Sequence, residues 1–283
     1  MSIRITADSP ADLPKEICDK YGVNTVPLHI ILGDGCFDDG ITVTPDDIYD
    51  YYERAKALPK TSAVSVAEYA SFFEKLTENG DSVIHFCISS GISSTYQNAV
   101  LAAEDFPNVF IIDSKSFTTG IALLVIKAAE MAESGMSAEQ VALESSKLVG
   151  KMDTTFIVSN LEFLRKGGRC SGVAAFGANL LGIKPSITID SEGRLIVDKK
   201  YRGKLDACIE HYINDLLEEN KGNIDNSRAV LARTDGVTDE IMEKAKKQIT
   251  DAAGFKEVIV SKAGCTITSH CGKGTFCFMF MRK

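Results

Sequence analysis

A loop rich in hydroxyl side chains gives this sequence its strongest chemical signal. The loop follows an apolar run, precedes a helical pattern and consists of Ile88-Ser89-Ser90-Gly91-Ile92-Ser93-Ser94-Thr95-Tyr96-Gln97. Backbone N–H groups at a helix start, with hydroxyls beside them, can bind an anion. Capping of the helix by Ser93 or Ser94 is the simpler interpretation. Because the loop has more hydroxyls than capping needs and no Lys or Arg, we expect it to bind a carboxylate or a phosphate through neutral donors.

Polar side chains also follow other predicted strands. Asp8-Ser9 come after the first strand, Asp113-Ser114 come after a later one, and Thr61-Ser62 form a further hydroxyl pair. Each pair alone is explained by the turn preference of Asp and Ser. In open α/β sheets, however, ligands bind beyond the carboxyl ends of the strands. Together the pairs therefore predict one polar crevice.

A third feature is a basic segment that ends in two glycines. A short amphipathic helix from Leu161 would end at Gly167-Gly168, with Arg165 and Lys166 favourably placed near its C-terminus. A solvated helix end is a sufficient explanation for those two side chains. Arg169 follows the flexible glycines, and we expect it to point toward an anion.

The remaining motifs favour binding over catalysis. Gly272-Lys273-Gly274-Thr275 lacks the preceding glycine of a phosphate loop. Cys265, Cys271, Cys277 and His270 lack the close pairing of a structural zinc site, so we predict no metal and expect these thiols to be buried in a terminal strand. His270 is predicted in a loop, and it is the one histidine with a functional setting. No paired acidic groups in an apolar setting are visible.

The elements that would position these residues differ between the two parts of the chain. The first part alternates strands (83–88 and 109–112) with helices (48–57, 93–104, 122–133 and 138–149), which predicts a parallel sheet covered by helices. The first of these helices would start with Thr44-Pro45-Asp46 as its N-cap and first turn, and Gly33-Asp34-Gly35 before it resembles a hairpin turn. The second part has an α+β pattern. It combines a hairpin around Asp190–Gly193, helices at 205–219 and 238–251, and strands at 229–233, 258–260 and 275–281. We expect an N-terminal α/β domain over 1–155 and a C-terminal α+β domain over 156–283.

Composition excludes several classes of protein. The 283 residues are 45% hydrophobic, and 31 Lys and Arg against 39 Asp and Glu give a net charge of −8. This balance argues against a nucleic-acid binder, and no apolar run is long enough for a membrane span. The first strand begins almost at Met1, which leaves no room for a signal peptide. The eight cysteines are therefore expected to be reduced thiols in the cytoplasm.

These motifs, in this order and over essentially the whole chain, resemble those of the DegV family of bacterial fatty-acid-binding proteins. The matching segments are Thr6–Pro14, Thr61-Ser62, Ile88–Gln97, Asp113-Ser114, Leu164–Ser171 and His270–Gly274. The resemblance implies two α/β domains with a ligand tunnel between them that holds a long-chain fatty acid. It also implies that the protein is the lipid-carrying subunit of fatty acid kinase. The partner kinase would phosphorylate the bound carboxylate to an acyl phosphate.

The resemblance also assigns residues. Thr61 and Ser93 would hold the carboxylate, with Arg169 near the same crevice. The other ligand-binding residues expected are Ser94, Thr95 and Ser114. Arg202 and His270 would form a surface pair around the ligand mouth and the kinase.

Some positions depart from the family pattern. Ser94 stands where glycine usually follows the binding serine, which would tighten the loop, and Cys271, Lys273 and Phe276 differ from the commonest form. A preference for one fatty acid therefore does not transfer from the family.

We therefore expect a carrier that is not itself an enzyme, needs no cofactor beyond its bound fatty acid, binds no nucleic acid, and contacts membranes at most transiently. An alternative is a sugar-phosphate-binding enzyme of the isomerase type that uses the Ser/Thr-rich loop. It predicts a polar pocket with a general base, whereas the lipid interpretation predicts apolar walls. A third possibility, a protein-interaction module, predicts an empty crevice.

Overall fold

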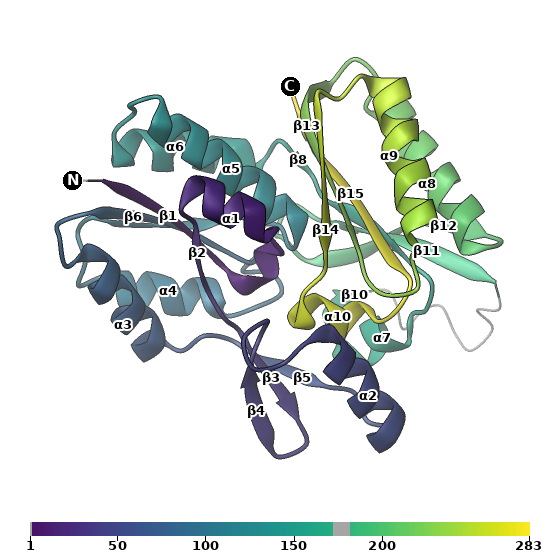
Figure 1. The fold of residues 1–283 in the computed structure, drawn as a ribbon, viewed down its shortest axis with the longest axis horizontal. Coiled ribbons are helices and arrows are strands. Elements are labelled where there is room, and N and C mark those ends of the chain that lie inside the picture. Colours follow the sequence, from purple (N-terminus) through teal and green to yellow (C-terminus); the bar gives the residue numbers. More distant parts are fainter. Residues whose placement is uncertain (1, 172–181) are drawn as a thin grey trace.

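The computed structural model describes residues 2–171 and 182–283, with the N-terminal half on the left of Figure 1 and the C-terminal half on the right. The N-terminal half is built on a four-stranded parallel sheet in the order β2 (Asn24–Val26), β1 (Ile3–Asp8), β6 (Ser82–Cys87) and β7 (Val109–Asp113). A 3-10 turn, η1 (Ser9–Ala11), follows β1. The predicted strands β6 and β7 are confirmed, and the helix between them begins two residues later than predicted, at Thr95.

Helices cover both faces of this sheet. One face carries α1 (Lys15–Tyr21), α5 (Thr119–Glu133) and α6 (Ala138–Val149), and the other carries α3 (Val66–Thr77) and α4 (Thr95–Ala103) (Figure 1). Ten of the 15 residues of α5 are buried. The helix is apolar around most of its circumference because it packs on β1 and β6 and also on β13 (Ile224–Arg233) and β15 (Thr275–Arg282) of the other half.

A second, smaller sheet follows β2. Its antiparallel strands β4 (Gly35–Asp38), β3 (His29–Leu32) and β5 (Lys60–Ser62) lie in that order, and the predicted turn at Gly33-Asp34 joins the first pair. Helix α2 (Pro45–Ala55) begins as the sequence predicts. Thr44 caps it, and a capping box joins the Thr44 and Asp47 side chains to the backbone.

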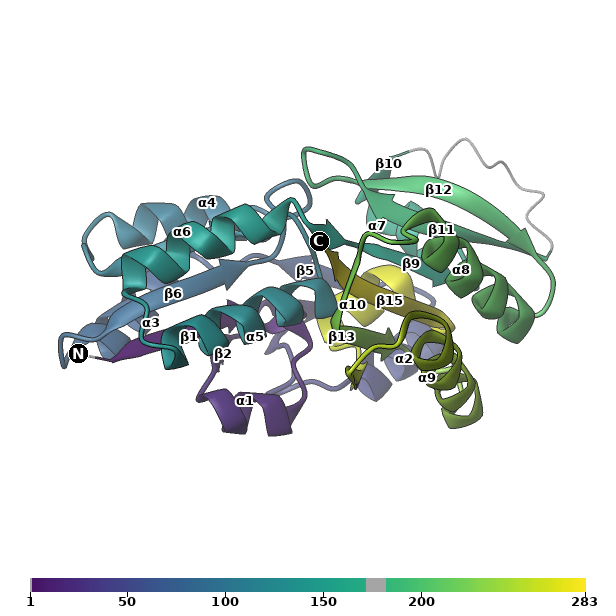
Figure 2. The ribbon, with the colours of Figure 1, turned by 90° about the horizontal axis from the view of Figure 1, so that it is seen from above.

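The C-terminal half is a mixed sheet of eight strands. The order is β10 (Cys170–Ser171), β12 (Leu195–Arg202), β11 (Ile183–Ile189), β9 (Thr155–Val158), β15, β13 and β14 (Glu257–Lys262), with β8 (Met152–Asp153) paired to β15. The predicted β11–β12 hairpin is confirmed, and Gly193 in its turn has φ +80°. Helices α8 (Leu205–Glu219) and α9 (Asp239–Ala253) cover the outer face, as Figure 2 shows from above.

The parallel sheet in the first part and the mixed sheet in the second confirm the predicted α/β class. The mixed sheet starts with β8, directly after α6, so the expected division between residues 155 and 156 would fall inside β9. Over residues 2–171 and 182–283, no helix combines the length and apolar character needed to cross a membrane.

Two short helices of the C-terminal half, α7 (Glu162–Gly167) and α10 (Cys265–Cys271), pack against each other just above α2 and the small sheet in Figure 1, and α10 also contacts α2, η1 and β3 of the N-terminal half. The prediction of a loop at His270 was wrong, because His270 belongs to α10. The prediction that Cys265 and Cys271 lie in a strand was also wrong, although Cys277 does lie in β15. The sequence gives no local sign of this helix because its start is held by Asp39, a carboxylate more than 200 residues away.

Candidate functional site

A pocket of about 610 Å³ lies between the two halves. The N-terminal half contributes β5, the loop after β6 and the segment after β7, and the C-terminal half contributes β9, the start of β12 and α10. Its polar lining includes Thr61, Ser90, Ser93, Ser94, Arg169 and His270. Its apolar lining includes Leu28, Ile88, Phe117, Phe156, Leu195 and Ile267. The pocket thus combines neutral hydroxyls and a few cations with extended apolar walls.

Ser93 lies directly before α4 and lines the pocket. Its Oγ accepts a hydrogen bond from the backbone N–H of Thr95 at 3.2 Å and also contacts the Thr95 hydroxyl. Thr95 is fully buried and is not one of the described residues that line the pocket. Its contacts therefore hold Ser93 in place. Ser94 also lines the pocket, and its side chain makes no capping hydrogen bond within the described chain.

Thr61 and His270 meet at the wall of the pocket. Thr61 Oγ1 lies 2.8 Å from His270 Nε2, although the residues belong to β5 and α10. Burial, and next the positive charge of Arg169, lower the pKa of His270 to about 4, so the imidazole is neutral at pH 7. Its Nδ1 is buried and has no hydrogen-bond partner among the described residues. An unpartnered buried N–H is especially unfavourable, so the proton belongs on Nε2, where Thr61 Oγ1 accepts it.

Two carboxylates of the N-terminal half hold α10 in this position. Asp39 accepts hydrogen bonds from the backbone N–H of Cys265 at 2.8 Å and from the Thr266 hydroxyl at 2.7 Å. Asp12 accepts the N–H of Gly264 at 2.8 Å. Burial raises the pKa of Asp12 to about 7, which the nearby Asp39 reinforces. Sequence reasoning missed both residues, because the helix they cap is distant in the chain.

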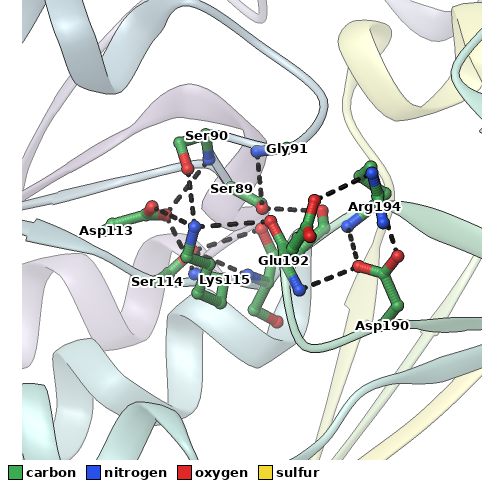
Figure 3. A network of polar contacts seen from close by, with 11 residues as sticks. Ser89, Ser90, Gly91, Asp113, Ser114, Lys115, Asp190, Glu192 and Arg194 are labelled. Atoms are coloured by element: carbon green, nitrogen blue, oxygen red, sulfur yellow. Dashed lines mark hydrogen bonds and ion pairs between the residues drawn. The ribbon is translucent and has the colours of Figure 1, made fainter.

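A polar network joins the serine-rich loop to the β11–β12 turn (Figure 3). The buried Ser89 hydroxyl donates to the carbonyl oxygen of Gly193 at 2.7 Å. Lys115 Nζ donates to Ser90 Oγ at 2.8 Å and to the carbonyl oxygen of Glu192 at 3.3 Å. These contacts place the turn against one wall of the pocket, and no sequence signal marked Lys115 as part of it.

Arg194 brings a cation from this turn to the pocket lining. Its guanidinium pairs with Asp190 at 2.9 Å and with Glu192 at 2.8 Å, as Figure 3 shows. Arg169 is exposed and directly precedes Cys170, which pairs with Leu195, so it lies beside Arg194 where the two neighbouring strands begin; its Nη1 donates to the carbonyl oxygen of Gly167 at 2.8 Å. Sequence reasoning identified Arg169 but missed Arg194, because a turn arginine beside two acidic residues resembles a solvated ion pair.

Besides Thr95, two more of the expected site residues are absent from the described pocket lining. Ser114 is fully buried and hydrogen bonds with the backbone of Ser116, so it braces a segment instead of facing a ligand. Arg202 is exposed at the end of β12 and is not among the described pocket-lining residues. The expected surface pair of Arg202 and His270 needs correction, because His270 points inward to Thr61.

The strand-end pair Asp8-Ser9 also serves the framework. The Asp8 carboxylate accepts hydrogen bonds from the Tyr69 hydroxyl and the backbone N–H of Ile88, and it contacts His85 Nε2. Asp8, His85 and Cys87 form the one group of the described residues whose atoms lie close enough to share a metal ion. All three are fully buried, and the carboxylate oxygens already have partners, so the group anchors the start of the serine-rich loop.

This arrangement defines a class of protein: two α/β halves with a pocket between them that is lined by both polar and apolar side chains. The chain belongs to the DegV family. The profile of this family, described as an uncharacterised protein of the DegV family, matches residues 2–283.

Relatives cover nearly the whole chain. A fatty acid-binding protein from Thermotoga maritima is 33% identical over 98% of this chain and 97% of its own length. A DegV family protein from Thermus thermophilus, described for its fatty acid binding, is 31% identical with a TM-score of 0.88 over 100% of both chains. A stearic acid-binding protein from Eubacterium ventriosum is 29% identical with a TM-score of 0.84, over 100% of this chain and 99% of its own.

Proposed function

We propose that this protein binds one long-chain fatty acid in the pocket between its halves and presents the carboxylate to a separate fatty acid kinase. The observation that carries the proposal is the pocket itself, in which the hydroxyls of Thr61 and Ser93 occur together with apolar walls. The fatty-acid binding named for the relatives supports the same ligand class. The sugar-phosphate alternative has weaker support, because large apolar side chains contribute much of the lining.

Thr61 and Ser93 are the proposed carboxylate ligands. With His270 Nε2–H donating to Thr61 Oγ1, the Thr61 hydroxyl hydrogen is free to donate to a carboxylate oxygen. Ser93 Oγ accepts from the Thr95 N–H, and in this proposal its own hydroxyl donates to the same carboxylate. Ser94 and Arg169 line the same region. Hydrogen bonding is required here, because an unpartnered carboxylate in an apolar site is strongly unfavourable.

The apolar walls supply most of the binding free energy in this proposal. Each buried methylene contributes ~0.8 kcal/mol, so a long acyl chain contributes on the order of 10 kcal/mol before the entropy cost of binding. The pocket volume of about 610 Å³ is in the range of small-molecule sites.

In this proposal phosphoryl transfer belongs to the partner. The sequence has no phosphate loop, and the donors around the carboxylate are neutral hydroxyls that leave one carboxylate oxygen available as a nucleophile. The kinase would supply ATP and magnesium; that oxygen would attack the γ-phosphorus as the bond from the γ-phosphorus to the bridging oxygen breaks, which gives an acyl phosphate and ADP as the leaving group. The protein would contribute positioning, which can account for a large part of such a rate enhancement.

Mass spectrometry of the intact protein and of its organic extract tests the ligand class. We expect one fatty acid per chain, either as purified or after loading with palmitate or oleate. A sugar phosphate in the extract, or no uptake of either fatty acid, contradicts the proposal.

The kinase step needs a separate assay. The loaded protein is incubated with a bacterial fatty acid kinase and magnesium–ATP, and acyl phosphate is trapped with hydroxylamine as the hydroxamate. We expect hydroxamate only when kinase and loaded protein are both present. Loaded protein that yields none with kinases from several DegV-containing bacteria contradicts the carrier role and leaves fatty-acid binding intact.

A further inference from the structure

The segment that carries Phe117 into the pocket has an unusual backbone. Lys115 has φ +45° and Thr118 has φ +43° with ψ −132°, so a residue other than glycine has a positive φ on each side of Phe117. Such conformations are unfavourable for residues with a Cβ and persist only where the surroundings hold them. Unfavourable backbone conformations are more frequent at functional sites than elsewhere. The position of Phe117 between two of them therefore needs a physical explanation.

Buried hydrogen bonds hold this segment rigidly. The Ser114 hydroxyl accepts the backbone N–H of Ser116 at 3.1 Å, and the Ser116 carbonyl oxygen accepts the N–H of Ser89 at 2.9 Å. The Thr118 hydroxyl donates to the Asp12 carboxylate. These bonds fix the direction of the Phe117 side chain, which is 2% exposed.

Phe117 meets Phe156 of β9 across the two halves. The ring centroids are 5.1 Å apart with an interplanar angle of 76°, an edge-to-face pair, and both rings line the pocket. Neither ring offers a hydrogen-bond donor to a carboxylate, whereas Thr61 and Ser93 do. The apolar chain of a fatty acid whose carboxylate is held by the hydroxyls needs apolar walls, and the aromatic pair is part of those walls.

The structure behind the pair is closely packed. The Ser116 hydroxyl lies 3.0 Å from the Thr154 hydroxyl, which ties together the backbones that carry the two rings. A methyl group added at Gly120 would lie 2.0 Å from Ser116 Oγ and 3.2 Å from Met279 Sδ. The segment that carries Phe117 is therefore tied to the backbone before β9 and closely packed at α5, and both rings are themselves almost fully buried.

We propose that the Phe117–Phe156 pair is the apolar stop that sets the length of the acyl chain accepted by the pocket. The proposal rests on fatty-acid binding as the function of the pocket. Ser114 then has a defined role as a positioning residue, because it holds the segment that aims Phe117.

The test measures competition binding of saturated fatty acids from 12 to 20 carbons. It compares the unaltered protein with Phe117→Leu and Phe156→Leu. Each methylene that a variant newly buries should lower Kd roughly fourfold. We expect the affinity optimum of each variant to move toward longer chains by one to two carbons. Phe278→Leu is the matched control, because Phe278 is fully buried and pairs with Phe280 at the same 5.1 Å but on the opposite face of the sheet. Its optimum should match that of the unaltered protein.

Thermal unfolding monitored by circular dichroism establishes that the variants are folded. If a leucine variant does not fold, Phe117→Met replaces the rigid ring by a flexible chain that adapts to irregular space, so its profile should broaden toward longer acids. Folded variants with the unaltered chain-length profile overturn the stop and leave the proposed function standing. An unaltered protein that binds none of the series overturns the proposed function.

Discussion

Thr61 Oγ1 and His270 Nε2 lie 2.8 Å apart although 209 residues separate them in the chain. The contact joins β5 of the N-terminal half to α10 of the C-terminal half, and both residues line the pocket. The proposed carboxylate site is therefore assembled by the docking of the halves.

Removal of the two proposed carboxylate donors should weaken fatty-acid binding by a limited amount. A neutral hydrogen bond contributes a net ~0.5–1.5 kcal/mol, so Thr61→Val combined with Ser93→Ala should cost about 1–3 kcal/mol in binding, measured by titration with palmitate. Thr77→Val is the control, because its hydroxyl bonds within α3 and lies outside the described pocket lining. Unchanged affinity in the double variant would remove both residues from the site.

The buried imidazole of His270 should make folding stability depend on pH. Its pKa is lowered from 6.5 to about 4, so the unfolded chain binds the proton first as pH falls. Between about pH 6.5 and pH 4, the unaltered protein should therefore lose stability relative to His270→Gln, by on the order of 1 kcal/mol per pH unit. Above pH 6.5 the difference between the two proteins should be constant.

Urea unfolding at intervals of pH measures this difference. The comparison with His270→Gln is needed because Asp12 has the opposite effect on folding stability as pH falls, and that effect is present in both proteins. Its raised pKa of about 7 makes the folded state bind the proton first, which favours folding as pH falls from about 7 toward 3.8. A stability difference between the unaltered protein and His270→Gln that stays constant with pH would show that His270 is not buried as a neutral group.

The contact between Gly193 and Ser89 should be sensitive to a single methyl group. A Cβ on Gly193 would lie 2.1 Å from Ser89 Oγ, in a backbone with φ +80°. Gly193→Ala should therefore shift the turn, lower stability by about 2–4 kcal/mol and speed dissociation of a bound fatty acid.

Gly222→Ala separates the steric effect from the backbone effect. Gly222 also has φ +80°, but nothing lies within 4 Å of its Cβ position. This control should lose only about 1–2 kcal/mol and keep the dissociation rate unchanged. Equal effects of the two substitutions in stopped-flow displacement and in urea unfolding would show that the Ser89 contact is not a constraint.

Removal of the distant cap of α10 should disturb the pocket. Asp39→Ala leaves the N–H groups of Cys265 and Thr266 without their acceptor, so we expect a loss of about 2–4 kcal/mol in stability. Because α10 carries His270, fatty-acid affinity should fall as well. Asp34→Ala in the exposed β3–β4 turn is the control, and it should change neither quantity. Asp39→Ala that retains full affinity would show that α10 is held by its packing alone.

The local sequence pattern was sufficient to predict the bounds of elements whose start and stop signals lie in their own residues. Helix α8 has the predicted bounds, and α2 begins at the predicted Thr44 cap. Both signals lie within a few residues of the element they define. The serine-rich loop was recognisable for the same reason, because several hydroxyls in one loop exceed what a helix cap requires.

Helix α10 could not be predicted in this way, because its cap is Asp39 in the other half. The inward position of His270 follows from that cap, and so it was missed as well. Ser114 shows the converse, since a hydroxyl at a strand end resembles a ligand-binding group until its bonds to Ser116 are seen.

The sequence by itself determined the α/β class, the family and the residue types of a neutral anion site, because periodicity, caps and motifs are properties of neighbouring residues. Only the tertiary structure decided which of those residues share one pocket. It paired Thr61 with His270, placed Phe117 against Phe156 and turned Ser114 inward. The physical reason is that buried hydrogen bonds and side-chain packing act over a few ångströms in space, regardless of separation along the chain.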